Sequence, residues 1–402
     1  MTFKYIGKEF TRIDAFEKVT GEAKFFADLK FPKTLHAKIL RPEYAHARIL
    51  SIDISQAEKC EGVHKVITGK DCNIIFGTCI FDQSPLAIDK VRHIGEPLAA
   101  VLADTEKNAN AALKKIKVEY EPLPVYIDAL KAMEKDAVLI HEKNGDYFHF
   151  SSYFPEKGTN IFHHYKLRKG DIDKGISESD VFVEGEFEFP LNSHCAMEPH
   201  GAACRWDFNN TINIWSTTQS PNIVCEVLAH MFNLPHSKVR VHVSYLGGAF
   251  GGKSDVILEP LVAYLASFVP GYTVRLVLSR KEVFGTILGR GMKAKMRIGA
   301  TKDGILKSLQ ASLYFTDGAY ADTACNIVTV AGHNCVGPYE IENCYVDSYG
   351  VYTNTPPVGA YRGYGHPEGC FVIERLIDML ARKLNISPFE IRRKNFLKEG
   401  KR

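Results

Sequence analysis

The sequence has no long uninterrupted apolar run and almost no excess of charge. Its longest apolar stretches, 97–103 and 256–269, are too short or too interrupted to cross a bilayer. The opening MTFKYIGKEF does not form a secretory signal. A net charge of +3 over 402 residues gives no electrostatic case for binding nucleic acid or an anionic membrane surface. The sequence therefore predicts a cytoplasmic protein with no membrane span and no nucleic-acid partner.

Closely spaced cysteines are missing as well. None of the ten cysteines stands in C-x-x-C spacing, which zinc ribbons and iron–sulfur clusters normally use. The histidines at 163, 164, 194 and 200, the last two near Cys195, have no second ligand pair at a suitable spacing for zinc. The G-x-S-x-G elbow of many hydrolases does not occur. We expect reduced cysteines and no metal bound directly by side chains, and any iron–sulfur cluster would be carried by another chain.

What the sequence does contain is a mixture of short strand patterns and helix patterns. Strands are predicted at 63–67, 99–102, 118–121, 181–189, 212–216 and 238–245. Helices are predicted at 106–115, 171–178 and 255–268, and further helices open at Pro221, Pro367 and Pro388. Residues 133–180 show little periodicity, so we expect a connecting segment that crosses a surface and contains one short helix.

The most informative stretch is GGAFGGKS at 247–254. Glycines combine left-handed backbone angles with the lack of a side chain, so such a loop can lie against a bulky anionic ligand. The stretch fits the phosphate-binding pattern G-x-x-x-x-G-K-[ST], in which Lys253 would contact phosphate and Ser254 would bind magnesium. However, Arg240, His242 and Ser244 interrupt the preceding strand, whereas the corresponding strand of a nucleotide hydrolase is apolar throughout. Phosphotransfer with a nucleotide is kept as the alternative function.

Other motifs stand in a fixed order along the chain. They are RIDAFEKVTGEAKFFADL from residue 12, HAR from 46, GEPLAAV from 95, EP at 198, STTQ from 216, LPHSKV from 234, DGAY from 317, GPY from 337 and AYRGYG from 360. Together with the glycine stretch, which is similar to a GGGFGGK loop, the set resembles the molybdenum hydroxylase family of xanthine dehydrogenase and aldehyde oxidase. The likeness runs from about residue 12 to residue 399.

The resemblance implies an α+β (mixed α/β) fold. An N-terminal α/β-hammerhead domain would be followed by the first molybdopterin-binding domain, with mixed sheets and packed helices. The expected boundaries are a lead-in at 1–14, the hammerhead domain at 15–130, the connecting segment at 131–180 and the molybdopterin-binding domain at 181–402.

The resemblance also implies the cofactor and the residues around it. Molybdenum would be held by the dithiolene sulfurs of molybdopterin, in its cytosine dinucleotide form, with no protein ligand to the metal. Gln219 matches a glutamine that hydrogen-bonds the apical oxygen of the metal. The loop residues Gly248, Ala249, Phe250 and Gly251 match those beside metal and pterin, with Phe250 as an aromatic wall of the metal pocket.

Three further residues concern the substrate. Arg362 matches the arginine of A-[FY]-R-G-[FY]-G, whose guanidinium could bind the cofactor region and a substrate carbonyl or carboxylate. Ser254 stands where xanthine-oxidising members have a glutamate, so other N-heterocycles, nicotinate- or purine-like, or aldehydes are the expected substrates. Phe396 falls where some members place a ring that stacks on the substrate. Gly363 stands where carbon monoxide dehydrogenases begin a cysteine-containing insert, so that chemistry is not expected.

The family's catalytic glutamate lies in a second molybdopterin domain, and Glu96 belongs to a different context. We therefore expect the N-terminal half of a split large subunit, as in nicotinate dehydrogenase. Its partners in a hetero-oligomer would be a second molybdopterin subunit carrying that glutamate, a [2Fe-2S] subunit and an FAD subunit. Water would supply the oxygen atom. A non-catalytic homologue that acts in assembly is a further alternative.

Overall fold

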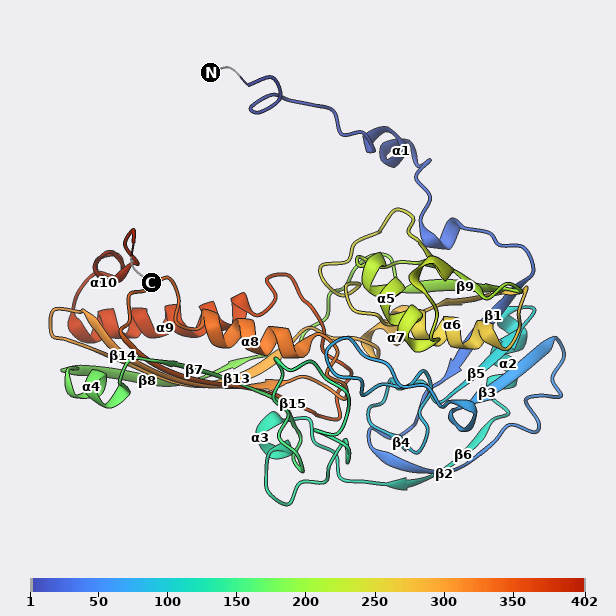
Figure 1. The fold of residues 1–402 in the computed structure, drawn as a ribbon, viewed down its shortest axis with the longest axis horizontal. Coiled ribbons are helices and arrows are strands. Elements are labelled where there is room, and N and C mark those ends of the chain that lie inside the picture. The colour runs from blue at the N-terminus through green and yellow to red at the C-terminus, as the bar shows by residue number, and fades with distance from the viewer. Residues whose placement is uncertain (1–2, 401–402) are drawn as a thin grey trace.

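The computed structural model describes residues 3–400, which form an elongated body of two lobes with an N-terminal arm projecting from it (Figure 1). One lobe is built on a seven-stranded sheet and a small three-stranded sheet, and the other on a five-stranded sheet. The arm carries the short helix α1 (Ala15–Thr20), which buries none of its residues. The fold is therefore α+β with mixed sheets, as predicted.

The seven-stranded sheet has the order β11-β10-β9-β12-β1-β5-β3. Its strands are β1 (Thr34–Leu40), β3 (Val63–Thr68), β5 (Ala99–Ala103), β9 (Gly201–Asp207), β10 (Thr211–Ser216), β11 (Val239–His242) and β12 (Thr273–Val277). Strand β1 pairs parallel to β12 and antiparallel to β5. The helices of this lobe are α2 (Glu106–Leu113), α5 (Pro221–Met231), α6 (Glu259–Ser267) and α7 (Arg280–Phe284).

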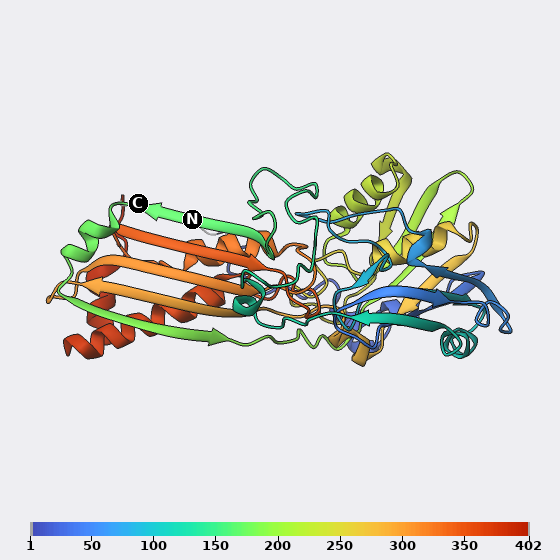
Figure 2. The same ribbon diagram turned by 90° about the horizontal axis from the view of Figure 1, so that it is seen from below.

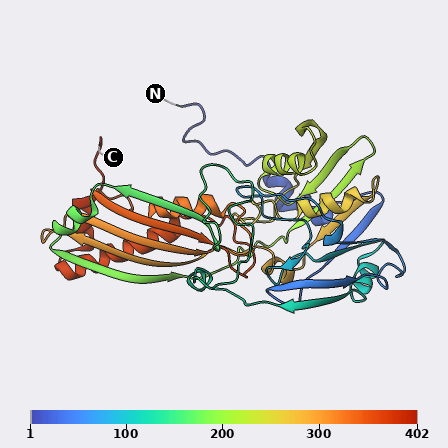
Figure 3. The ribbon, with the colours of Figure 1, turned by 60° about the horizontal axis from the view of Figure 1, so that its bottom comes forward.

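The main core of this lobe lies between the sheet and helices α5 and α6. Helix α6 is buried along its whole length except its last residue, because nearly every side chain in it is apolar. Helix α5 buries only one stripe, including Val224, Val227 and Leu228, at helical spacing. On another side of the lobe lies the three-stranded sheet, β4 (Lys90–Val91), β2 (Ala47–Asp53) and β6 (Lys117–Pro122), seen in Figure 3.

The five-stranded sheet has the order β7-β15-β14-β13-β8. Its strands are β7 (Ile161–Lys169), β8 (Val181–Phe189), β13 (Gly291–Ala300), β14 (Leu306–Thr316) and β15 (Asn343–Val351). Helices α8 (Ala324–Asn334) and α9 (His366–Leu384) cover one face, and Figure 2 shows most of the other face free of helices, apart from the end where α3 (Ala129–Ala132) packs. The uncovered face is polar, with Lys295 directly opposite Glu186 on neighbouring strands. The remaining helices are α4 (Ile172–Ser177) and α10 (Pro388–Asn395).

One segment of the second lobe, residues 317–323, connects it with the first. The Ala321 amide donates to the Asp82 carboxylate at 2.8 Å, and the Thr78 hydroxyl donates to Asp322 at 2.6 Å. The Tyr320 hydroxyl donates to Glu96. These bonds tie two regions of the chain that lie more than two hundred residues apart in sequence.

Two sequence-based expectations need correction. Residues 131–180 do not merely connect domains, because β7 lies within them and forms one edge of the five-stranded sheet. The strands at 201–277 also complete a sheet with β1, β3 and β5, so the seven-stranded sheet combines segments from both predicted domains. The domain boundaries themselves stay a prediction. The helices predicted at 106–115, 171–178 and 255–268 are confirmed as α2, α4 and α6 with shorter bounds.

Among residues 3–400, no helix is both long and apolar enough to span a membrane. The cysteines are all free, and six of them are buried.

Candidate active site

The loop at 247–254 follows β11 and turns sharply on itself. Gly248, Phe250 and Gly251 have positive φ angles of 96°, 57° and 100°. A side chain at Gly251 would place its Cβ 2.4 Å from the Ala360 carbonyl oxygen, so glycine is required where the loop meets the 360–365 segment. A positive φ is uncommon for phenylalanine and indicates that the surroundings fix this turn.

The outer rim of the loop presents free hydrogen-bond donors. Within the described part of the chain, the amide N–H groups of Gly248, Ala249 and Phe250 donate to no other residue. The Phe250 ring lies beside them and is 48% exposed, so it is not a core anchor. Consecutive amides without partners in a glycine-rich turn are a typical site for anionic oxygens.

Gln219 lies against this loop, just before helix α5. Its side-chain oxygen accepts a hydrogen bond from the Gly251 amide at 3.1 Å and another from the Ser254 hydroxyl at 3.3 Å. Its own backbone N–H donates to the Lys253 carbonyl at 2.7 Å. These bonds fix the side-chain oxygen and leave the NH2 group of the amide free to donate to a ligand.

Arg362 reaches the same place from the segment between β15 and α9. Its backbone N–H donates to the Phe250 carbonyl at 2.9 Å, which fastens the two loops together. Its guanidinium is exposed and forms no hydrogen bond or ion pair with any residue in the described range. The structure thus brings Gln219, Phe250, Gly251 and Arg362 together at one surface, and their roles stay a prediction.

Lys253 does not point toward this surface. Its ammonium is 2.7 Å from the Glu198 carboxylate, and the lysine is only 2% exposed. Glu198 also accepts from the Gly247 amide at 2.9 Å and the Phe26 amide at 3.3 Å. Moreover, helix α6 begins at Glu259, so the loop does not run directly into the helix that follows it, as a phosphate-binding loop does. The nucleotide alternative therefore has no support.

The histidines considered as zinc ligands instead support the loops. The His194 ring is 2.7 Å from the Ala360 carbonyl oxygen, and the His200 ring is 2.6 Å from the Gly252 carbonyl oxygen. Burial lowers the pKa of His200 to about 4 and also lowers the pKa of His194, so both rings are neutral at pH 7. No cluster of three metal-ligating side chains occurs in the range 3–400.

A hollow of about 790 Å³ opens beside the 360–365 segment. Tyr364 forms part of its wall, two residues after Arg362, and α5, which begins two residues after Gln219, forms another part. Its remaining lining is rich in rings, with Phe81, Phe148, Phe150, Tyr153 and His230. This size and lining suit a small flat molecule.

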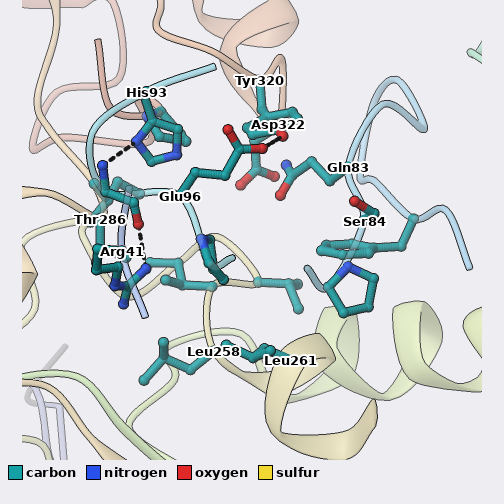
Figure 4. A pocket seen from close by; sticks show the side chains of 18 residues that line it. Arg41, Gln83, Ser84, His93, Glu96, Leu258, Leu261, Thr286, Tyr320 and Asp322 are labelled. Atoms are coloured by element: carbon teal, nitrogen blue, oxygen red, sulfur yellow. Dashed lines mark hydrogen bonds between the residues drawn. The ribbon is translucent and has the colours of Figure 1, made fainter. Parts of the chain in front are cut away.

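A second pocket, shown in Figure 4, is separate from that surface. Its lining includes Glu96, Tyr320, Asp322 and Arg41, and like the hollow beside Tyr364 it contains neither Gln219 nor Arg362. The Glu96 carboxylate points toward Tyr320 and accepts from its hydroxyl, and the Arg92 amide donates to it as well. Glu96 therefore has a structural role at the junction of the lobes, which agrees with the expectation that it is not the catalytic glutamate.

Phe396 is not brought to the loop. It follows α10 and stacks on Tyr339 with ring centroids 5.7 Å apart, and the Tyr339 hydroxyl donates to Glu374. Glu374 lies eight residues into α9, which is roughly 12 Å along the helix from its first residue. Figure 1 shows α10 at the end of the body remote from α5. The interpretation of Phe396 as a substrate-stacking ring was wrong, because helix packing accounts for its position.

Several residues of the site were not identified from the sequence, among them Lys253 as the partner of Glu198. The motif E-P at 198 and the loop lysine were both noted, but nothing in their spacing indicates that they pair across 55 positions. A general signal was present nonetheless, because a lysine and a glutamate within otherwise apolar stretches are seldom buried without a partner.

Comparison with known proteins agrees with this geometry. Residues 153–396 match the family described as "Molybdopterin cofactor-binding domain", and residues 20–124 match "Aldehyde oxidase and xanthine dehydrogenase, a/b hammerhead domain". The chain is 35% identical over 396 residues to the nicotinate dehydrogenase large molybdopterin subunit of Eubacterium barkeri, covering 97% of this chain and 89% of that protein.

Longer relatives and solved structures match over the same range. The xanthine dehydrogenase molybdenum-binding subunit of Escherichia coli O157:H7 is 32% identical over 97% of this chain and 52% of its own length. The crystal structure of quinoline 2-oxidoreductase from Pseudomonas putida 86 superposes with a TM-score of 0.88 at 30% identity, covering 99% of this chain and 51% of that chain. The chain spans about half the length of most of the relatives it matches.

Proposed function

This chain belongs to the molybdenum hydroxylase family of xanthine dehydrogenase and aldehyde oxidase, and we propose that it forms the molybdopterin-binding part of such an oxidoreductase. The reaction would hydroxylate an electron-poor carbon of an N-heterocycle, nicotinate- or purine-like, or of an aldehyde, with water as the oxygen source. The observation that carries the proposal is the meeting of three kinds of free donor at one surface. They are the Gln219 amide, the backbone amides of 248–250 and the Arg362 guanidinium.

These donors fit a molybdenum–molybdopterin cofactor. When bound, the cofactor supplies the redox centre that takes up the electrons of the oxidation. The chain's own part is to hold it by hydrogen bonds. The backbone amides of Gly248, Ala249 and Phe250 can donate to its oxygens with no side chain in the way at Gly248. The free NH2 group of Gln219 donates beside them, and its orientation is set by Gly251 and Ser254. We infer the cytosine dinucleotide form of the pterin.

Arg362 would act on the substrate. The Arg362 guanidinium forms no bond with any described residue, whereas the Arg362 backbone is bonded to Phe250. The position of the charged group can therefore vary only by rotation of the arginine side chain. It can bind a carbonyl or carboxylate and stabilise negative charge that develops during the reaction. Phe250 would form an apolar wall next to it. The Ser254 hydroxyl is engaged with Gln219, so its role is to orient Gln219 as well as to line the substrate side.

We propose that the substrate approaches through the hollow beside Tyr364. The hollow adjoins the segment that carries Arg362, and its aromatic lining favours a flat ring over a flexible polar molecule. The similarity to nicotinate dehydrogenase and quinoline 2-oxidoreductase supports an N-heterocycle before an aldehyde.

The activity would require partners. We propose a second polypeptide with the other molybdopterin domain, which supplies the glutamate that accepts a proton, together with a [2Fe-2S] chain and an FAD chain that pass electrons on. The 89% coverage of the large molybdopterin subunit of nicotinate dehydrogenase supports this arrangement. We place the assembly in the cytoplasm.

The test is to isolate the native assembly with its co-purifying chains and to measure molybdenum, pterin and nucleotide. We expect molybdenum and a pterin cytosine dinucleotide in equal amounts, and hydroxylation of one member of a panel of nicotinate, purines, quinoline and aldehydes. An assembly that contains neither molybdenum nor pterin would refute the proposal. An assembly that contains both but oxidises only aldehydes would refute the preference for a heterocycle.

A further inference from the structure

Two buried charged side chains hold the backbone immediately before Arg362. The carboxylate of Asp255 accepts a hydrogen bond from the Ala360 amide at 3.0 Å, and the guanidinium of Arg290 donates to the Gly359 carbonyl at 2.6 Å. Asp255 is 2% exposed and Arg290 is 1% exposed. Neither residue belongs to the glycine loop or to the segment that it holds.

The contact with Asp255 is closely fitted. A Cβ added to Gly359 would lie 1.8 Å from the Asp255 carboxylate, so only glycine leaves room for it. The other carboxylate oxygen of Asp255 accepts from the Thr323 hydroxyl at 2.6 Å. Both oxygens are therefore used, one by the segment before Arg362 and one by the segment that joins the lobes.

Arg290 is surrounded by acidic side chains. Asp255, Asp317 and Glu368 are the carboxylates that act on its charge, and all three are buried. Burial raises the pKa values of Asp255 and Asp317. Such a group of buried ionisable groups is costly to assemble, because each charge loses its hydration and only attraction and hydrogen bonds within the group offset that loss.

The position of Asp255 in the chain links the two loops of the site. It follows Ser254 directly, so it is the first residue after the glycine loop, and it holds Ala360 two residues before Arg362. The Arg362 amide in turn donates to Phe250 within the glycine loop. Two hydrogen bonds therefore join the two loops. One links Asp255 to Ala360, and the other links Arg362 to Phe250.

We propose that Asp255 and Arg290 are positioning residues, which fix the backbone that carries Arg362, and thereby the reach of its guanidinium, in relation to the glycine loop. They do not touch substrate or cofactor themselves. The catalytic part of this inference rests on the proposed function, whereas the structural part concerns this chain alone.

Asp82 offers a matched control for Asp255. It is a buried carboxylate that also accepts from one backbone amide, that of Ala321 at 2.8 Å, and from one hydroxyl, that of Tyr352 at 2.8 Å. Replacing either aspartate by leucine or asparagine removes the same kinds of bond, but only Asp255 is bonded to the segment that carries Arg362. Effects of general destabilisation should therefore appear in both sets of variants.

The first measurement is hydrogen exchange of the purified complex, followed in peptides that cover 358–364. Asp255→Leu should accelerate exchange there by about tenfold, since it removes a buried hydrogen bond, and Asp255→Asn by less. Asp82→Leu should leave these peptides unchanged. If Asp255→Leu does not assemble, Asp255→Asn carries the test. Unchanged exchange at 358–364 in the Asp255 variant that assembles would overturn the structural part of the inference, whatever the cofactor content.

The second measurement is a double-mutant cycle with Arg362→Ala in the metal-loaded complex. Asp255→Asn should lower kcat by roughly tenfold to a hundredfold with little change in KM, as a displaced catalytic group does. In the Arg362→Ala background the same substitution should have less than about a threefold effect, because its target is gone. An equal effect in both backgrounds would overturn the positioning role. Arg290→Lys should behave like Asp255→Asn, because a lysine cannot reproduce the planar guanidinium contact.

Discussion

The ion pair between Lys253 and Glu198 should be among the strongest single contributions to the stability of the first lobe. Lys253→Met removes the ammonium and leaves the Glu198 carboxylate, whose side chain is 11% exposed, with the amides of Gly247 and Phe26 as its remaining donors. Breaking one side of such a buried pair costs about 3–5 kcal/mol, because the other charge stays desolvated without a partner. We expect the free energy of unfolding to fall by that amount.

The chain contains a convenient probe for this lobe. Both of its tryptophans, Trp206 and Trp215, lie in neighbouring strands of the seven-stranded sheet. Tryptophan fluorescence during urea unfolding therefore reports the lobe that contains the ion pair, even if the two lobes unfold separately. Arg48→Met is the control, since Arg48 and Glu121, on neighbouring strands of the same lobe, form an exposed pair at 3.6 Å, and such pairs contribute about 0–1 kcal/mol.

The pairing itself is tested by adding Glu198→Gln to Lys253→Met. The doubly substituted protein has no unpaired buried charge, so it should lose less stability than the sum of the two single variants, by about 1–3 kcal/mol. Two results would refute the reasoning. One is a loss below about 1 kcal/mol for Lys253→Met, which would mean that the lysine is hydrated. The other is simple additivity of the two substitutions.

Three other outcomes follow from the same geometry. Arg362→Ala should lower turnover by about 10²–10³-fold while molybdenum content stays unchanged, and loss of metal together with turnover would make its role structural. Burial raises the pKa of Asp82 to about 7 from an ordinary 3.8. Between these two pH values the native state binds more protons than the unfolded chain does. The free energy of unfolding therefore falls as pH rises through that range. Asp82→Asn should remove this pH-dependent part of the free energy of unfolding, which amounts to up to about 4 kcal/mol. If the free energy from urea titrations keeps the same slope against pH in this variant, the prediction is contradicted. Phe396→Ala should leave kcat and KM within about threefold and reduce stability by about 0.5–1.5 kcal/mol, the worth of an aromatic pair, whereas a large rise in KM would restore its role at the substrate.

Local patterns were sufficient to predict where the glycine-rich turn lies. The glycines at 247–252 require a turn, and the motifs at 219 and 362 have local features, a proline that starts a helix and glycines that flank an arginine. The structure brings these segments together, although Arg362 lies more than a hundred residues beyond the other two in the chain. Resemblance to a family, not periodicity, supplied that part of the prediction.

The strand β7 could not be predicted, for a physical reason. Its sequence IFHHYKLRK places two histidines where a buried strand would ordinarily have apolar residues. His163 is buried and meets the Thr329 hydroxyl at 2.9 Å, and His164 contacts Asp347 at 2.9 Å. These partners lie far away in sequence, so the polar residues appear unsuited to a sheet until the tertiary contacts are known.

The same limit applies to sheet order. Strand β1 pairs with β12, and the paired residues Thr34 and Thr273 are separated by most of the chain. Both strands are short. Hydrophobic alternation indicates which face of a strand is buried, but it does not indicate which other strand pairs with it. The prediction of separate N-terminal and C-terminal domains therefore missed the shared seven-stranded sheet.

The free donors at the site also constrain what can cover it. Gln219 and Arg362 are exposed, so their NH2 group and guanidinium can bond to water, and the amides of 248–250 have no partner among the described residues. A partner surface that removed this water without offering acceptors would leave buried donors unpaired, at about 1–3 kcal/mol for each, and more for the charged group. Any molecule that binds here stably must therefore bring oxygens, as a phosphate-bearing cofactor and a carboxylate from a second polypeptide would. An apolar partner that covered this surface with high affinity would contradict both the proposed cofactor and the proposed companion subunit.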